Sequence, residues 1–329
     1  MKTSIAIAFF SLCVTAFAQQ SELPNFAASI LESDLRQHIQ TLAADSMQGR
    51  QTGTDAAFMA ADYIAGQFEK INLGSPYDST YFQAFVTNTP GVNVVGVIEG
   101  SDLKEQALVI SAHYDHLGMF DGNIYNGADD NASGVAAMLE IAEAFVAMAR
   151  NHYPPRRSVV FIAFDAKEQK MAGSAYYVNN PLYPLQRTVA NLNIDAVGRV
   201  EGSPNGQRNY LFLVGANRMS SDLQDISDYV NHVRKINLNL DYTFYNSPTF
   251  SEIFYLFSDQ YNFGKHQIPV IYYMDGLHDD LNKPTDTEEQ IDYKILRDRT
   301  QLIFYTAWEL ANRDGELKKD LIKTKTNPE

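Results

Sequence analysis

The sequence predicts an α/β protein built on a mostly parallel sheet that helices cover on both faces. Two observations predict it. Short runs rich in Val, Ile and Phe alternate along the chain with segments of helical periodicity. Histidine and acidic residues follow directly after several of those runs, as in sheets whose strands end in one crevice. Strands that alternate with helices favour a three-layer α/β/α arrangement.

The expected elements follow from local pattern. Segments with an apolar face at a spacing of three and four residues are expected to be helices. These are 33–44, 56–71, 132–150, 173–178, 220–233 and 293–312. Short runs enriched in β-branched and aromatic residues are expected to be strands. These are 81–86, 93–98, 107–111, 158–164, 189–194, 210–214 and 269–274.

The sequence predicts a single domain. It contains no repeat, no low-complexity tract and no Gly/Ser/Pro linker long enough to separate two domains. We expect a signal peptide at 1–18, a single domain at 19–314 and a charged tail at 315–329.

The first residues have the pattern of a secretion signal. Lys2 precedes the apolar stretch 5–17, and small residues at Ala16 and Ala18 suit cleavage before Gln19. The stretch is shorter than the roughly 20 apolar residues of a membrane span. A buried N-terminal helix is the alternative. We therefore expect a protein that is exported to the periplasm or the outside of the cell, cleaved after Ala18 and not membrane-spanning.

Composition argues against thiol chemistry and against nucleic-acid binding. The single cysteine, Cys13, lies inside the signal, so the mature chain uses no thiol for disulfides, catalysis or metal binding. Acylation at Cys13 is disfavoured because the large Leu12 precedes it. The formal net charge of −14 disfavours nucleic acid, which is bound through Lys and Arg.

Candidate metal ligands stand after three predicted strands and at the start of one predicted helix. His113 and Asp115 follow the strand 107–111, and Asp130 lies at the start of a helix. Glu168 and Asp195 follow the next two strands. Each alone is more simply a helix cap or a hydrogen-bonded pair. Together, imidazole and carboxylates converging from separate strands indicate a zinc site.

The segments that carry these residues resemble the co-catalytic zinc aminopeptidase family, which includes bacterial leucine aminopeptidases and has glutaminyl cyclases as relatives. The resemblance covers nearly the whole mature chain and implies a twisted mixed sheet flanked by helices, the zinc-exopeptidase form of the phosphorylase/hydrolase-like fold. The matching segments are 112–116, Gly-Ala-Asp-Asp-Asn-Ala-Ser-Gly at 127–134, Glu168 with Gly173-Ser174, Asn193-Ile194-Asp195, 258–263 and 276–287.

The resemblance assigns roles to five residues. His113 and Asp195 match the ligands of one zinc, and Asp130 matches the carboxylate that bridges both ions. Glu168 matches a ligand of the second zinc. Asp115 matches the residue that fixes the His113 imidazole by hydrogen bonding from behind.

Three positions depart from the family pattern. Lys167 replaces the glutamate that serves as general base, and an ammonium cannot accept a proton. Asn282 replaces the last metal-binding histidine, which makes it a doubtful ligand, and Leu281 replaces the tyrosine that donates to the oxyanion. Loss of a general base alone costs about 10²–10⁴-fold in rate, so N-terminal residue hydrolysis is expected to be weak or lost.

The ligand set of the first zinc is whole, whereas the second keeps only Asp130 and Glu168. We therefore expect one zinc ion rather than two, and hypothesise that Lys167 supplies positive charge in place of the second. The expected function is a zinc aminopeptidase-like homologue that binds peptide, with little hydrolysis. An active mononuclear metallohydrolase with an altered mechanism is one alternative. A peptide-binding or scaffold protein without catalysis is another. Glutaminyl cyclase activity is disfavoured because it needs the broken ligand set.

Overall fold

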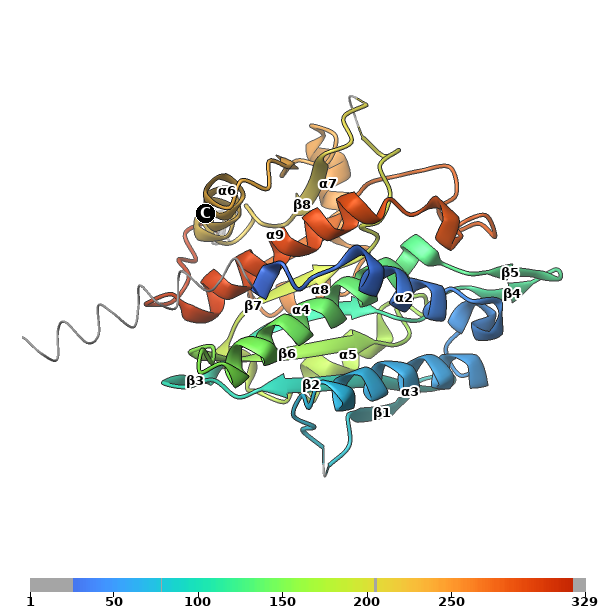
Figure 1. The fold of residues 1–329 in the computed structure, drawn as a ribbon, viewed down its shortest axis with the longest axis horizontal. Helices are drawn as coiled ribbons and strands as arrows, with labels where there is room; N and C mark the ends of the chain where they lie inside the picture. Colours follow the sequence, from blue (N-terminus) through green and yellow to red (C-terminus); the bar gives the residue numbers. More distant parts are fainter. Residues whose placement is uncertain (1–25, 78, 204–205, 322–329) are drawn as a thin grey trace, which may run out of the picture.

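An eight-stranded mixed sheet forms the centre of the molecule (Figure 1). The computed structural model describes residues 26–77, 79–203 and 206–321. The sheet order is β1-β2-β6-β3-β7-β10-β8-β9. Neighbours β6, β3, β7 and β10 run parallel, whereas β1, β2 and β8 pair antiparallel with their inner neighbours. The strand bounds are β1 Phe82–Val86, β2 Pro90–Ile98, β3 Leu103–His113, β6 Arg157–Phe164, β7 Thr188–Ile194, β8 Tyr210–Val214, β9 Asn239–Asp241 and β10 Val270–Met274.

Helices cover both faces of the sheet, as expected. Five pack in one apolar cluster on the first face, and three smaller ones contribute to the cluster on the other. The first face carries α2 Glu32–Leu42, α3 Asp55–Lys70, α4 Gly134–Arg150, α6 Ser221–Val233 and α9 Tyr293–Asn312. The second carries α5 Ala172–Asn179, α7 Pro248–Tyr255 and α8 Gln260–Gly264.

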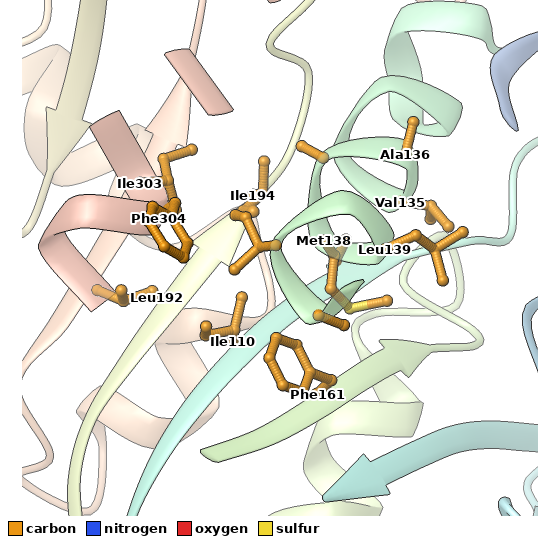
Figure 2. Packing of buried hydrophobic residues seen from close by; sticks show 14 of the residues in the cluster. Ile110, Val135, Ala136, Met138, Leu139, Phe161, Leu192, Ile194, Ile303 and Phe304 are labelled. Carbon is orange, nitrogen blue, oxygen red and sulfur yellow. The ribbon is translucent and has the colours of Figure 1, made fainter. Parts of the chain in front are cut away.

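The helix α4 lies at the centre of the core because it is apolar nearly all round. Its side chains and those of α9 meet the central strands β3, β6 and β7 (Figure 2). The segment Ala128–Arg150 is long and apolar enough to cross a membrane, but 83% of its apolar window is buried within the fold. That burial is typical of the core helix of a globular domain.

Every predicted helix and strand is present, with bounds that shift by a few residues. Among the described residues, five α-helices and strands were not predicted: β9, α7, α8 and a hairpin of β4 Gly118–Phe120 and β5 Asn123–Tyr125. The hairpin strands have three residues each, too few to show a period. They flank an Asp121-Gly122 turn, and the hairpin extends from the body of the molecule (Figure 1).

The C-terminal tail is described as far as Leu321. The expected signal at 1–18 lies outside the described residues. The described part of the tail packs on the start of α6, where the Lys318 N–H donates to the Asp222 carboxylate at 3.0 Å. The Asp320 carboxylate accepts from the backbone and the hydroxyl of Ser221.

Candidate metal centre

The candidate ligands come from the carboxyl ends of neighbouring parallel strands. His113 is the last residue of β3, and Asp195 directly follows β7. Lys167 and Glu168 lie three and four residues beyond the end of β6. Since β6, β3 and β7 are adjacent in the sheet, these side chains meet at one edge.

Three predicted ligands lie in contact. The Nε2 atom of His113 is 3.1 Å from Asp195 Oδ1 and 3.2 Å from Asp130 Oδ1. All three side chains are buried. The Nδ1 atom of His113 donates to the backbone carbonyl of Asp115 at 3.0 Å, which directs Nε2 toward the two carboxylates. The Ser258 hydroxyl donates to the other Asp195 oxygen and fixes its orientation.

This cluster fits a zinc ion. One imidazole nitrogen and two carboxylate oxygens are donors that zinc accepts. Asp130 Oδ1 is buried and makes no hydrogen bond, although a buried carboxylate oxygen normally has a partner. Burial and Lys167 lower the pKa of His113, but Asp195, Asp115 and Asp130 more than offset them and raise it well above its ordinary value. The carboxylates therefore favour a cation at this position.

Asn131 holds the ligand-bearing backbone together. Its side-chain amide donates to the carbonyls of His113 and Ile194, the last residues of β3 and β7. Its side-chain oxygen accepts from the N–H groups of Gly134 and Ala196. The residue after Asp130 thus links both strand ends to the start of α4.

The Asp115 carboxylate contacts the segment that carries Lys167 and Glu168. It accepts from the backbone N–H groups of both residues at 3.0 Å and from the Thr52 hydroxyl at 3.2 Å. Its Oδ1 atom is 3.6 Å from His113 Nδ1. Asp115 therefore acts on His113 mainly through its backbone carbonyl, while its carboxylate positions residues 167 and 168.

The Lys167 ammonium points into the carboxylates. Its Nζ atom is 2.9 Å from Glu168 Oε1 and 3.5 Å from Asp130 Oδ1, and only 15% of the side chain is exposed. Burial lowers the pKa of Lys167, but Asp130, Asp195 and Glu168 outweigh it and raise the pKa well above its usual value. The amine is therefore charged at neutral pH and has no lone pair with which to accept a proton.

The loop after β10 carries Leu281 and Asn282, the other two positions where the sequence predicts a departure from the family pattern. Leu281 is half-buried and Asn282 is exposed, with a φ of 59° that asparagine tolerates better than most residues. Four residues on, the buried Asp286 carboxylate accepts from the N–H groups of Asp129 and Asp130. The loop thus reaches the ligand-bearing segment through Asp286, while Asn282 remains at the surface.

Two buried residues near the centre had no role in the sequence interpretation. His116 is 1% exposed, both of its ring nitrogens lack a hydrogen-bond partner, and burial lowers its pKa to about 4. Arg50 is equally buried and donates to four backbone carbonyls around the centre. His116 directly follows Asp115 in the segment 112–116, and this proximity was the sequence signal that could have identified it. For Arg50 the only sequence signal is the preceding Gly49.

A second cluster and a cavity lie outside this set. Asp129, Asp275 and His278 bring ligand-type atoms within 4.8 Å of one another. The Arg299 guanidinium already pairs with the Asp275 carboxylate at 3.3 Å, and the backbone N–H of Arg199 donates to the same oxygen. A cavity of about 510 Å³ is lined by Arg218, Glu252 and Tyr255, among others, and by none of the candidate ligands. The candidate site is therefore defined by its cluster of ligand-type side chains and lies apart from this cavity.

Curated relatives match parts of the chain. Aminopeptidase YwaD of Bacillus subtilis is 33% identical over 114 residues, which are 34% of this chain and 23% of the relative. A probable glutamate carboxypeptidase of Arthroderma benhamiae is 34% identical over 33% of this chain and 14% of the relative. The protein YfbL of Escherichia coli is 27% identical over 64% of this chain and 68% of YfbL. The first two matches thus span a quarter or less of the relatives' length.

Solved structures share the fold. LapA aminopeptidase of Legionella pneumophila superposes with a TM-score of 0.69 at 19% identity, covering 89% of this chain and 75% of LapA. BSAP, a zinc aminopeptidase from Bacillus subtilis, gives 0.68 at 15% identity over 89% and 99% of the two chains. Glutaminyl cyclase of Porphyromonas gingivalis gives 0.64 at 15% identity over 84% and 97%.

The family model described as Peptidase family M28 matches residues 93–307, which include all the candidate ligands and every strand of the large sheet except β1 and the first three residues of β2. The resemblance inferred from the motifs and the α/β/α fold expected from it are both confirmed. This chain is a member of peptidase family M28.

Proposed function

We propose that this protein is an exported zinc-binding member of its family that binds peptide ends and hydrolyses N-terminal residues weakly or not at all. The observation that carries the proposal is the Lys167 ammonium. It stands where the family resemblance expects the general base, and it donates to Glu168.

The electrostatics of the centre support this function. In the resemblance, a carboxylate at position 167 would accept a proton from the attacking water. Here the side chain is a cation that neutralises Glu168 and Asp130 instead. Leu281 has no donor with which to stabilise an oxyanion. The residues can thus hold a ligand beside a metal, but the groups that would move protons are absent from positions 167 and 281.

Zinc fits the triad of His113, Asp130 and Asp195, and when bound it would polarise a peptide carbonyl as a Lewis acid. The protein's own contribution is orientation. The Asp115 carbonyl fixes the tautomer of His113, and Ser258 fixes the Asp195 carboxylate.

An active mononuclear hydrolase is the second candidate, and the intact triad favours it. Glutaminyl cyclase activity has less support, because the histidine expected at position 282 is absent.

Back-substitution separates these functions. We expect the triple variant Lys167→Glu, Leu281→Tyr, Asn282→His to exceed the wild type by at least about 100-fold in kcat/KM, because it restores base, donor and ligand. The assay uses aminoacyl-nitroanilides with added Zn²⁺, Mn²⁺ or Co²⁺. Lys170→Glu makes the same charge change at an exposed lysine and is the control. A wild type as active as the triple variant would contradict the proposed loss of hydrolysis and favour the active hydrolase.

Metal analysis tests the triad directly. Purified wild-type protein should hold about one zinc per chain, and His113→Ala should lose it because the triad keeps only carboxylates. His266→Ala removes an exposed histidine and should leave the zinc content unchanged. A wild type without zinc after exposure to the ion would overturn the proposed metal site.

A further inference from the structure

We propose that this chain contains a second divalent-cation position formed by His116, Asp130 and Glu168, and that the Lys167 ammonium competes with the cation for it. The proposal rests on the proposed function only because Asp130 is shared with the zinc triad. In this proposal His116 is the imidazole ligand of the second ion, a role for which Asn282 is unsuited.

The first support is the position of the His116 ring. A ring nitrogen of His116 and carboxylate oxygens of Asp130 and Glu168 all lie within 4.8 Å of one another. One imidazole and two carboxylates are again a zinc-type donor set, and soft and hard donors in this ratio also accept Co²⁺ and Mn²⁺.

The second support is the lack of hydrogen bonds to His116. The side chain is 1% exposed, and neither Nδ1 nor Nε2 has a partner. Buried polar atoms are bonded in the large majority of cases, and an unbonded one calls for an explanation such as an ion. Asp130 Oδ1 also makes no hydrogen bond, although His113 Nε2 and Lys167 Nζ lie 3.2 and 3.5 Å from it. A cation between the two side chains would satisfy both.

The third support is that the His116 ring is held in place. A Cβ atom on Gly127, which has a φ of 57°, would lie 2.6 Å from the His116 ring carbon Cδ2 and 2.3 Å from the carbonyl oxygen of Asp130. Only glycine allows this close approach. The His116 N–H also donates to the Arg50 carbonyl at 3.3 Å. Position 116 is therefore fixed by backbone contacts, as a ligand requires.

Asn282 lacks these properties. It is exposed, and its amide oxygen is a poorer zinc donor than imidazole. His116, three residues beyond the end of β3, is therefore a better ligand for a second ion in this chain than Asn282.

The Lys167 ammonium already lies against two of the three groups, 2.9 Å from Glu168 and 3.5 Å from Asp130. An ammonium and a divalent ion repel each other strongly at such distances. Lysine has a flexible stem and 15% of this one is exposed, so the ammonium can move outward when a metal binds. The second ion should therefore bind, but more weakly than the first.

Cobalt binding to the full-length protein tests the proposal without any substrate. Chelator-treated protein is titrated with Co²⁺, bound ions are counted by elemental analysis after equilibrium dialysis, and the visible absorption of Co²⁺ reports nitrogen coordination. Wild type should bind one ion tightly and a second more weakly. Lys167→Met should tighten the second by at least about tenfold, whereas Lys170→Met should not.

The ligand is identified in the Lys167→Met background. Adding His116→Phe should remove the second ion and spare the first, and adding Asn282→Ala should change nothing. Adding His113→Ala should remove only the first ion, which separates this proposal from the proposed function. His116→Ala repeats the test if the phenylalanine variant does not fold, with folding monitored by circular dichroism.

Two results would overturn the proposal. One is a second ion that binds equally well without His116. The other is a Lys167→Met variant whose second Co²⁺ ion binds no more tightly than the second ion of the wild type.

Discussion

Burial sets the ionisation of Asp259, a residue next to the Ser258 that orients Asp195. One Asp259 oxygen accepts from the Ser174 hydroxyl, and the other has no partner. Burial raises the pKa of Asp259 to about 7, although His113 and Ser174 act in the opposite direction. In the unfolded chain the pKa returns to its ordinary value of 3.8. The folded protein therefore binds the extra proton between about pH 4 and pH 7.

Asp259→Asn should change the pH dependence of stability. Because the folded-state pKa is raised, the free energy of unfolding of the wild type falls as pH rises through this window, by up to about 1.4 kcal/mol per pH unit from this group. The variant lacks that loss, so its stability relative to wild type should be greater at pH 8 than at pH 4. Urea unfolding at both pH values measures the difference, with the exposed Asp225→Asn as control. Equal pH profiles would show that Asp259 is ionised in the folded state.

A single residue also decides the charge of the metal centre. A lysine at position 167 differs in charge by two from the glutamate that the family resemblance predicts there, and its ammonium is close enough to Asp130 and Glu168 to compensate both. The sequence alone predicted that the base is missing. It did not show where the ammonium points, because a lysine stem has several rotamers and only the surrounding carboxylates select among them.

At the scale of elements, Arg50 joins three segments around the centre. Its guanidinium donates to the carbonyls of Leu42, Tyr114, Asn126 and Gly127 at 2.5–2.9 Å. These lie at the end of α2, just after β3, and just before the Asp130 segment. The arginine thus replaces regular backbone pairing where the chain leaves its helices and strands.

Arg50→Met should destabilise the protein by about 3 kcal/mol or more, because buried carbonyls left without donors each cost about 1–3 kcal/mol. Arg50→Lys should recover part of the loss, since lysine donates from one point and cannot reach all four. Arg187→Met, at an exposed arginine, should change the free energy of unfolding by less than about 0.5 kcal/mol. Denaturant unfolding of the three variants provides the comparison. A loss at Arg50 no larger than at Arg187 would contradict the linking role.

The long elements were predictable and the short ones were not. The helices α4 and α9 show a helical period of apolar residues, and the strands β6 and β10 are continuous apolar runs, so each could be recognised in the sequence. The α7 and α8 helices have eight and five residues, and their form depends on packing against the second face of the sheet. For the same reason the triad was predictable from strand ends, whereas the contacts of His116 and Arg50 depend on distant backbone.

At the scale of the whole molecule, the C-terminal segment closes the fold. Arg157, the first residue of β6, donates to the carbonyls of Leu310, Arg313 and Gly315. Leu317 is 9% exposed and belongs to the main apolar cluster. The residues beyond α9 therefore contribute to the core as well as to the surface of α6.

A chain ended after Leu321 should keep wild-type stability, because it retains all of these contacts. A chain ended after Asn312 should lose about 2 kcal/mol or more, since Arg157 loses two acceptors and Leu317 is removed. Urea unfolding compares both with the full-length protein. Equal stability of the two truncations would show that the segment after α9 adds nothing to the fold.

The four hydrogen bonds of the Asn131 side chain affect how easily the candidate centre unfolds locally. They join β3, β7 and α4, the most buried parts of the protein, to the residue after Asp130. Local opening there would require breaking into the core, so amide hydrogen exchange near Asn131 should be as slow as global unfolding allows. If the proposed function is right, the backbone frame of the candidate centre is intact, and the triple variant should gain activity without any change to that frame.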